Sequence, residues 1–514
     1  MSDESTDPFL YLNYDCTYLV LQYLSIHDLA HAQLVCNLWH ILLREWVGGP
    51  ALRLHFPDAW KELRQEEEER QTAEMQGNIG NDGDMLEDAH DNRSSRLEMF
   101  NLYASDQACS EAWVSGRPKV TYNYPLGHPL GNMYTIAGDF IAWPQGDSIF
   151  WQRVGYQECE SNAQLSQYPV KKLDVNVRRY NVHFIRAHAA GLLLLVVYVP
   201  EERVFREHVF HLETGKELWV KQRDEESGRP YPIAMGMDRL YLYHNNTRRG
   251  VDTYDLRTGT LLASQPSCLP DADIDNRQTR IWRLGGRDVL VALSVVNVHA
   301  WHIDALIHFI DPDQGRTIDT ILFRHHVGLD PRAVKVRVSS RLNEFAFALV
   351  SEVCDEEMFL LKIQTFDYDF ATGKFVKRGS SEWFDLTDLD IKPADLLDYD
   401  PFRRVIAVAG RRDISPRIIS LDGDMGSFTC RTLAINTPAG SVVGGLENVI
   451  IDGSRLYVCY ESVHCMDDSG RLARKHETAV FEFGTRSNSS SHLSLGGEVC
   501  LHPLDSIGDL GRLI

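Results

Sequence analysis

The chain has 514 residues, of which 44% are apolar and 24% are charged, the proportions of a folded globular protein. Its formal net charge of −21 leaves no basic excess to neutralise phosphates, so composition argues against nucleic acid and anionic membranes as partners. The longest apolar run, from Ala187 to Pro200, is interrupted by His188 and is too short to span a bilayer.

The N-terminal residues and the cysteines indicate the cellular compartment in which the protein is expected. Met1-Ser2-Asp3-Glu4 lacks the basic and apolar regions of a secretory signal peptide. The ten cysteines are scattered and form no Cys-x-x-Cys pair, so we expect free thiols rather than disulfides or a zinc site. These features predict a protein of the cytoplasm, the nucleus or both.

Residues 1–11 are expected to be a disordered tail, and residues 12–57 a small helical module. Asp15 can cap a first helix that runs to about Tyr23, and Asp28 can cap a second one. Apolar residues recur at helical spacing along both, namely Tyr18, Leu21 and Leu24 in the first and Leu29, Ala32, Val35, Cys36 and Trp39 in the second. Periodicity alone is equally compatible with a helical hairpin that packs on the rest of the protein.

The module contains more apolar residues than two or three short helices can bury among themselves. Seven of them fall within nineteen positions: Leu21, Leu24, Leu29, Leu34, Val35, Leu38 and Trp39. A segment of this kind is expected to bind a partner surface.

The order of these residues resembles an F-box, the module by which substrate receptors of SCF-type ubiquitin ligases hold a Skp-type adaptor. Leu12 stands at the opening leucine of the family pattern, Asp15 at its acidic position, and Val35-Cys36-Asn37-Leu38-Trp39 at its closing motif. Asn13 and Ser25 stand where the family has proline, and Cys16-Thr17 replace its first apolar pair. The resemblance implies an adaptor-binding set of Leu12, Asp15, Val20, Leu21, Leu24, Leu29, Val35, Cys36 and Trp39, with cullin reached through the adaptor.

Residues 58–94 are rich in Glu, Gly, Asn and Asp, which predicts a flexible acidic linker. An acidic docking segment is the alternative interpretation. Residues 95–116 are then expected to form a linking helix that ends at Gly116 and fixes the orientation of the parts on either side. Its Trp113-x-x-Gly116 resembles the segment that joins an F-box to a WD-repeat propeller.

From residue 117 to residue 514 the sequence is typical of short strands separated by turns. Seven apolar runs recur about every fifty residues, which is a propeller period. They begin at Asp139, Leu192, Arg239, Val289, Phe345, Val405 and Arg455. An uninterrupted apolar strand is expected to be buried between blades.

A second unit follows most of these runs and ends in a tight turn, as in Thr253-Tyr254-Asp255-Leu256-Arg257-Thr258-Gly259. The glycine supplies the positive φ that the turn requires, and the alternating strand is expected nearer the outside. The pattern resembles WD-repeat or quinoprotein-like propellers, although recurring Trp-Asp and Gly-His signatures are absent. Either residues 119–124 or residues 498–504 could complete the terminal blade.

No constellation for catalysis, cofactor binding or metal binding is predicted. Asp311-x-Asp313-x-Gly315 and two similar triplets are typical of calcium loops, but none continues to the required Glu, and turns explain them. The motifs His299-x-x-His302 and His325-His326 lack a third ligand in sequence. Neither Gly-x-Ser-x-Gly nor a phosphate-binding Gly loop occurs.

The sequence therefore predicts a multidomain chain of α plus all-β class, with an F-box-like module followed by a seven-bladed β-propeller. Its expected function is substrate recognition in an SCF-type ubiquitin ligase, without an enzymatic activity or a cofactor of its own. The alternative is a propeller scaffold or propeller enzyme unrelated to ubiquitin, with the N-terminal helices packed on the propeller.

Overall fold

The structure is a computed structural model that describes most of the chain between Tyr14 and Gly484. Outside the described residues lie 1–13, 34, 36, 57–59, 61–63, 65–95, 97–99, 102–103, 128–133, 146, 159–164, 174, 176–181, 189, 225–229, 237, 245–249, 267–279, 285–286, 300–301, 327–333, 339–345, 355–358, 370–371, 373, 381–383, 392–395, 402, 411–412, 423–426, 438–439, 465–472 and 485–514. These gaps contain almost all of the predicted linker over residues 58–94.

The chain divides into two compact units, residues 1–112 and residues 113–514. The first, the helical unit, contains α2 (Tyr14–Gln22), α3 (Ile26–Ala32), α4 (Asn37–Trp46), the π-helical turn η1 (Val47–Ala51) and α5 (Leu52–His55). Residues 104–115 are also helical, and the division falls within them. Gly116 follows with φ of +60°, so the predicted helix end is confirmed.

The predicted helix starts in the helical unit need correction. Since α2 begins at Tyr14, Asp15 lies in its first turn and does not cap it. The cap of α3 is Ser25, whose Oγ accepts a hydrogen bond from the Asp28 N–H (3.1 Å), while Asp28 Oδ2 accepts one from the Ser25 N–H (3.3 Å). This reciprocal pair is a capping box. The single helix expected beyond Asp28 is two helices, and Val35 lies in the turn between them.

The helical unit has its own apolar core. Leu29, Val47 and Leu52 are completely buried in it, and Tyr18 packs edge-on against Trp46 with ring centroids 4.3 Å apart. Burial of each large apolar side chain contributes about 1.5–3 kcal/mol. The helical path continues through Pro50 as a π turn, because proline has no N–H for the regular hydrogen bond.

The second unit is a seven-bladed β-propeller. Its described residues form seven main antiparallel sheets, each built from four strands in a row, which we number blades 1 to 7. Blade 1 consists of β2 (Thr135–Ala137), β3 (Phe140–Gln145), β4 (Ser148–Arg153) and β7 (Lys171–Lys172). Blade 2 consists of β8 (Val182–His188), β9 (Leu192–Val199), β10 (Val204–His211) and β11 (Lys216–Asp224). Blade 3 consists of β12 (Pro230–Met235), β13 (Arg239–His244), β14 (Gly250–Asp255) and β15 (Leu261–Pro266).

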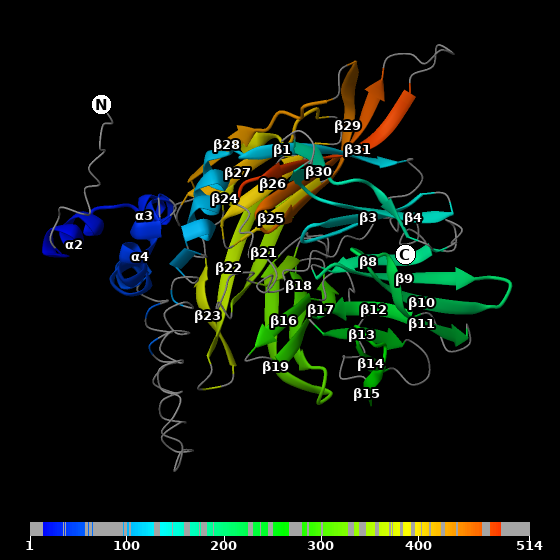
Figure 1. Cartoon of the computed structure of the whole chain (residues 1–514). Coiled ribbons are helices and arrows are strands. Elements are labelled where there is room, and N and C mark those ends of the chain that lie inside the picture. Colours follow the sequence, from blue (N-terminus) through cyan, green and yellow to red (C-terminus); the bar gives the residue numbers. More distant parts are fainter. Residues whose placement is uncertain are drawn as a thin grey trace, which may run out of the picture. The chain divides into compact units, whose positions relative to one another are not determined.

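The chain continues around the propeller in the same order (Figure 1). Blade 4 consists of β16 (Arg280–Leu284), β17 (Arg287–His299), β18 (His302–Asp311) and β19 (Arg316–His326). Blade 5 consists of β20 (Val334–Val338), β21 (Ala346–Cys354), β22 (Phe359–Asp369) and β23 (Lys374–Ser380). Blade 6 consists of β25 (Leu396–Asp400), β26 (Val405–Ala409), β27 (Arg417–Asp422) and β28 (Ser427–Thr432). Blade 7 consists of β29 (Ser441–Asp452), β30 (Arg455–His464), β31 (Ala473–Glu482) and β1 (Val120–Gly127). Outside this row lie β24 (Phe384–Asp385), which pairs with β22, the hairpin of β5 (Tyr156–Glu158) and β6 (Leu165–Gln167), and the 3₁₀ helix η6 (Thr387–Leu389).

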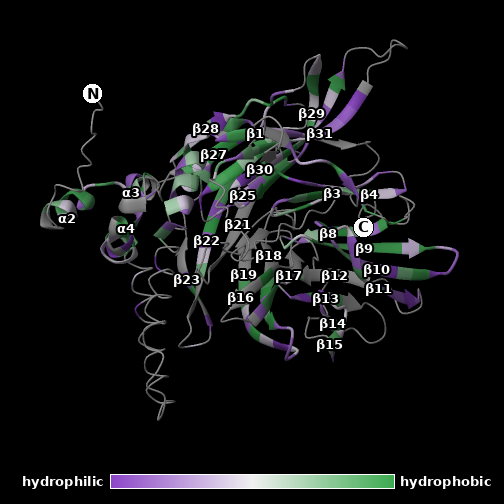
Figure 2. Cartoon of the chain, in the orientation of Figure 1, coloured by the Kyte–Doolittle hydropathy of each residue, from purple (hydrophilic) through white to green (hydrophobic). Residues whose placement is uncertain are grey.

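Each of the seven apolar runs is the second strand of its blade, as the fifty-residue period predicts. Strand β9 shows why such a strand is apolar throughout. Its residues Leu193, Leu195 and Val197 pack in the core between blades 1 and 2. The alternate residues Leu192, Leu194 and Val196 pack in the core between blades 2 and 3. Both faces of the strand are buried, and Figure 2 shows the hydrophobic colour along β9.

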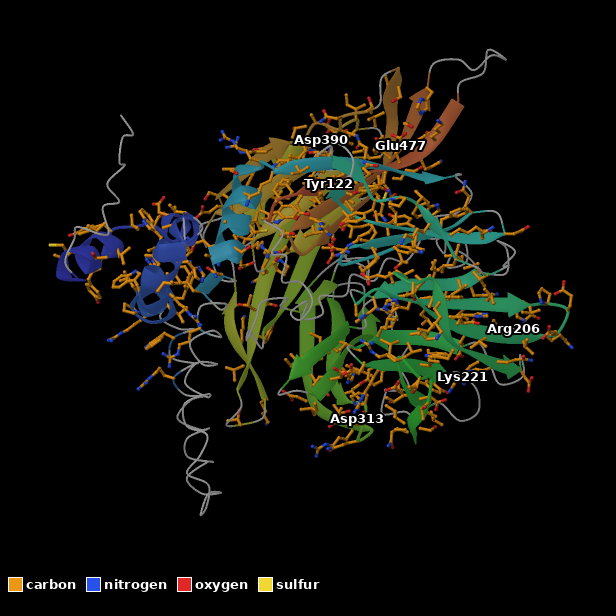
Figure 3. The ribbon with its side chains drawn as sticks, viewed as in Figure 1. Tyr122, Arg206, Lys221, Asp313, Asp390 and Glu477 are labelled. Carbon is orange, nitrogen blue, oxygen red and sulfur yellow. The ribbon has the colours of Figure 1, made fainter. Side chains whose placement is uncertain are left out.

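The predicted tight turns are confirmed after the third strands of blades 2, 3 and 4. Gly215, Gly259 and Gly315 have φ values of +67°, +68° and +60°. In blade 3 the Asp255 carboxylate accepts hydrogen bonds from the N–H (2.6 Å) and the hydroxyl (2.8 Å) of Thr258, which lowers the pKa of Asp255. In blade 4 Asp311 likewise accepts from the N–H groups of Asp313 and Gln314 (3.0 Å each). The Asp311-x-Asp313-x-Gly315 motif is thus a turn, and Asp313 (labelled in Figure 3) pairs with Arg239 of blade 3.

The ring is closed by the first strand of the propeller. Strand β1 is the fourth strand of blade 7 and pairs antiparallel with β31, from Val120 opposite Glu482 to Gly127 opposite His476. This is the first of the two predicted closures, while residues 498–504 lie outside the described residues. The core of Tyr124, Ile136, Trp143, Ile450 and Tyr457 then fills the space between blades 7 and 1.

The turn glycines provide a matched test of packing. A Cβ at Gly215 would meet no heavy atom within 4 Å, whereas one at Gly259 would lie 2.7 Å from the Trp219 ring of blade 2. We expect Gly215→Ala to lower the unfolding free energy by about 1–2 kcal/mol, the cost of a positive φ. Gly259→Ala should cost at least about 1 kcal/mol more, because Trp219 must also move. Chemical denaturation followed by near-UV circular dichroism measures both, and equal effects would contradict the contact.

Candidate functional site

The helical unit exposes several large apolar side chains, which we call the exposed apolar set. It consists of Leu19, Val20, Tyr23, Val35, Ile41 and Leu54. Leu19 lies in α2, and Tyr23 lies in the turn that directly follows the helix. Tyr23 is 88% exposed and Val35 is 62% exposed. Exposed large apolar side chains on a small unit make it a candidate for protein interaction.

The nine residues predicted to bind an adaptor fall into five groups. Val20 and Val35 are exposed, and Leu24 and Trp39 are half-buried against the core of the helical unit. Leu21 and Leu29 are buried in that core, so they can support a binding surface but do not form one. Leu12 and Cys36 lie outside the described residues, and Asp15 is described only as a backbone position in α2.

Sequence reasoning missed four members of the exposed apolar set: Leu19, Tyr23, Ile41 and Leu54. The four-residue spacing of Leu19 and Tyr23 was a usable signal in the sequence, since it suggests a second apolar side besides that of Leu21, although α2 ends at Gln22, before Tyr23. The turn that carries Val35 is held in part by Gln33, whose Nε2 donates to Leu29 O (3.3 Å) and to Asn101 Oδ1 (3.1 Å).

A second candidate region is a cluster of ionisable groups where blade 7 meets blade 1. Arg455 of β30 donates from Nε to Glu482 Oε2 (2.5 Å) and from Nη1 to Asp139 Oδ1 (2.8 Å) and Gly138 O (2.9 Å). Asp452 accepts a hydrogen bond from the Gly138 N–H (3.2 Å). Burial raises the pKa of Asp452 to about 7, although the positive charge of Arg455 lowers it. The groups satisfy one another, so the cluster ties the closing blades together and has the character of a structural contact.

A third cluster joins the outer strands of blades 2 and 3. Arg223 donates from Nε to Glu207 Oε1 (2.6 Å) and from Nη2 to the Tyr254 hydroxyl (2.6 Å), which donates in turn to Asp252 (2.9 Å). The Lys221 ammonium, labelled in Figure 3, lies 3.6 Å from the centroid of the Tyr254 ring, and burial lowers its pKa. Every group here has a partner between strands, which indicates stabilisation of the blade edge.

Other site types have no support among the described residues. Where side chains are described, no three His, Cys, Asp or Glu residues are grouped so that they could hold a metal ion. None of the described helices has the length and apolarity needed to cross a membrane. Among the described cysteines, Cys430 and Cys459 are free thiols.

No protein-family model and no curated protein matches the chain. Solved structures match with low similarity. Hydrazine synthase from Kuenenia stuttgartiensis is 13% identical at a TM-score of 0.37, with 69% of this chain and 97% of that chain covered. BamB from Moraxella catarrhalis is 12% identical at a TM-score of 0.30, with 66% and 95% covered. The WD40 domain of Toxoplasma gondii coronin is 12% identical at a TM-score of 0.34, with 72% and 88% covered. The assignment of the fold therefore rests on the strand pairing itself.

The division between core and exposed residues in the helical unit can be tested by truncation. We expect Leu29→Ala to destabilise the unit by about 2–5 kcal/mol, because it removes a completely buried side chain. Tyr23→Ala should change stability by no more than about 0.5 kcal/mol, since Tyr23 is exposed. Native-state hydrogen exchange across α2 to α4 measures both. Equal loss of protection in the two variants would contradict the burial.

Ionisation of the Asp452 carboxyl should make the stability of the contact between blades 7 and 1 depend on pH. An unfolded Asp has a pKa of about 3.9, so between that pH and about 7 the folded state binds the extra proton. The contribution of this group to stability therefore falls as pH rises through this window. Asp452→Asn keeps an acceptor for Gly138 and removes the charge. We expect the melting temperature of Asp452→Asn minus that of the parent to be larger at pH 8 than at pH 5.

The exposed carboxyl of Asp224 on β11 provides the control substitution, Asp224→Asn. The difference in melting temperature between Asp224→Asn and the parent should be the same at pH 5 and at pH 8. A pH-independent difference for Asp452→Asn would contradict the assigned pKa.

Proposed function

We propose that the chain is a bridging subunit: the helical unit binds a Skp-type adaptor of an SCF-type ubiquitin ligase, and the propeller binds the target protein. The observation that carries the proposal is the coincidence of two features at the same residues. Val20 and Val35 occupy positions of the F-box pattern and are also exposed apolar side chains. A pattern that served only the internal packing of the helices would place both positions in the core.

The proposed binding surface has a rigid support. Leu21 and Leu29 anchor α2 and α3 in the core, and Leu24 and Trp39 lie partly buried against it. The exposed apolar set is therefore carried on helices that contribute to this core and on the turns that follow α2 and α3. A standard protein interface buries about 800 Å² on each partner, and aromatic residues such as Tyr23 are often its energetic centre. We assign the contacts to Leu19, Val20, Tyr23, Val35 and Ile41.

The seven-bladed propeller suits the second half of the proposed role. Its second strands are covered by neighbouring blades, which leaves the turns and outer strands for contact with a target. Binding would hold a target lysine near the conjugating enzyme, and proximity of this kind is a large source of rate acceleration. In this proposal the chain supplies no catalytic residue and no cofactor and acts in the cytoplasm or the nucleus. Its net charge of −21 disfavours nucleic acid and anionic membranes as partners.

Co-purification of the full chain with a Skp-type adaptor tests the proposal. The key variants are Tyr23→Asp and Val35→Asp, which place a charge in the proposed interface without touching the core. We expect each to weaken adaptor binding by about 100-fold or more, because an unpaired carboxylate would be desolvated. Ile414→Asp is the matched control, since Ile414 is 66% exposed but belongs to the propeller unit. It should bind the adaptor like the parent.

Two results would contradict the proposal. One is a parent chain that does not co-purify with the adaptor although α2 to α4 are protected from hydrogen exchange. The other is undiminished binding by both key variants. Either would favour the alternative of a propeller scaffold or enzyme unrelated to ubiquitin.

A further inference from the structure

The hairpins that join the third and fourth strands of blades 2, 4 and 5 share one register. The last ladder pair before each turn is His211 with Lys216, Asp311 with Arg316, and Asp369 with Lys374. A cationic residue therefore begins the fourth strand in each of these blades, directly after the turn glycine. In blade 3 the turn itself carries the cation, Arg257. All four cations are exposed, and we call Lys216, Arg257, Arg316 and Lys374 the cationic rim.

Contacts between neighbouring blades show that these hairpins follow one another along one edge of the propeller. Trp219 of blade 2 donates a hydrogen bond from Nε1 to Leu256 O, in the turn of blade 3 (3.0 Å). Gln265 of blade 3 donates from Nε2 to Asp313 O, in the turn of blade 4 (3.2 Å). The fourth strands of blades 4 and 5, β19 and β23, are also in contact. The rim cations are thus presented by four successive blades.

The carboxylates of the same hairpins are held in contacts within the propeller. These contacts are Glu213 with Arg153, Glu217 with His208, Asp255 with Thr258, and Asp313 with Arg239. In contrast, Lys216, Arg316 and Lys374 form no ion pair with any side chain that the structure describes. The rim therefore carries positive charge that these side chains leave unneutralised, on a chain whose formal net charge is −21.

Exposed apolar side chains accompany the cations on the outermost strands. Val220 on β11, Val376 on β23, and Leu261 and Leu262 at the start of β15 are each about half exposed. Burial of such side chains favours a partner that has apolar groups of its own. Nucleic acid instead offers phosphates at a density that an acidic chain repels. The combination of cations and apolar side chains therefore favours a polypeptide.

We propose that the cationic rim binds an extended acidic segment of a protein, in which Asp or Glu residues are interspersed with apolar ones. An extended segment is required because the four cations lie on four different blades. Each exposed cation acts over about 8 Å at physiological ionic strength, so the rim attracts carboxylates close to it although the whole chain is acidic. The identity of the segment as part of the target protein rests on the proposed function, whereas the binding chemistry does not.

The test uses the full chain and a fluorescein-labelled peptide of about 16 residues, built from repeated Glu-Leu-Glu-Ser units, which at about 3.3 Å per residue can reach across several blades. We expect saturable binding by fluorescence anisotropy that weakens as salt is raised, because salt screens exposed cations. The same peptide with Gln in place of Glu should not bind. A single-stranded DNA of equal charge and vesicles that contain phosphatidylserine should not bind either.

Charge reversal within the rim should lower the affinity for the peptide. We expect Lys216→Glu to weaken binding by about 3-fold or more, because the change replaces an attraction by a repulsion. The triple variant Lys216→Glu, Arg316→Glu, Lys374→Glu should weaken it by about 30-fold or more. Lys475→Glu is the matched control for the single variant, since it makes the same change of charge at an exposed lysine of blade 7. It should bind like the parent, as should the charge-keeping triple variant Lys216→Arg, Arg316→Lys, Lys374→Arg.

The proposal is overturned if the peptide does not bind, if its Gln counterpart binds as tightly, or if the DNA or the vesicles bind more tightly than the peptide. It is also overturned if Lys475→Glu loses as much affinity as Lys216→Glu, or if the charge-keeping variant loses as much as the charge-reversed one. Circular dichroism compares the fold of all variants. Tyr23→Asp in the exposed apolar set should leave peptide binding unchanged, and the rim variants should leave adaptor binding unchanged. Failure of the rim and failure of the adaptor role are therefore distinguishable.

Discussion

Burial of one strand between two blades is the constraint on which the propeller depends. Alternate residues of β9 fill two different cores, so the strand tolerates a polar side chain on neither face. The same requirement recurs in the other blades, as in β26, which is buried at all five positions. Since no blade covers both faces of its own second strand, each blade needs neighbours on both sides. A closed ring satisfies this requirement for every blade, because each blade then has a neighbour on both faces.

The same constraint explains how much of the propeller could be predicted from sequence. A strand that is buried on both faces appears as an unbroken apolar run, so all seven second strands were visible at their fifty-residue period. Turn glycines were also visible, because few other residues adopt the positive φ of Gly215 and Gly259. The choice of closing strand was not visible, since the partner of β1 lies at the opposite end of the propeller sequence and no local pattern marks such a distant pairing.

The helical unit was predicted less completely, for a physical reason. Helical periodicity identifies an apolar side but not whether that side faces a core or the solvent. Leu21 and Val20 are adjacent in sequence and both match the F-box pattern, yet only Leu21 is in the core. The boundary between α3 and α4 was missed because apolar spacing continues through Val35, while the chain turns there. The reciprocal hydrogen bonds of Ser25 and Asp28 could have been predicted from the sequence, because the three-residue spacing of these residues is that of a capping box.

The pairing of β1 with β31 also has a consequence for synthesis on the ribosome. Strand β1 emerges first, but its partner emerges only after the six preceding blades have been translated. Until then β1 has an open edge, and the apolar residues between blades 7 and 1 have only half of their neighbours. Closing so long a loop is entropically costly and slow. Nascent chains are therefore exposed to mispairing and chaperone capture for nearly the whole of translation, and completion of the last blade is the event that ends this exposure.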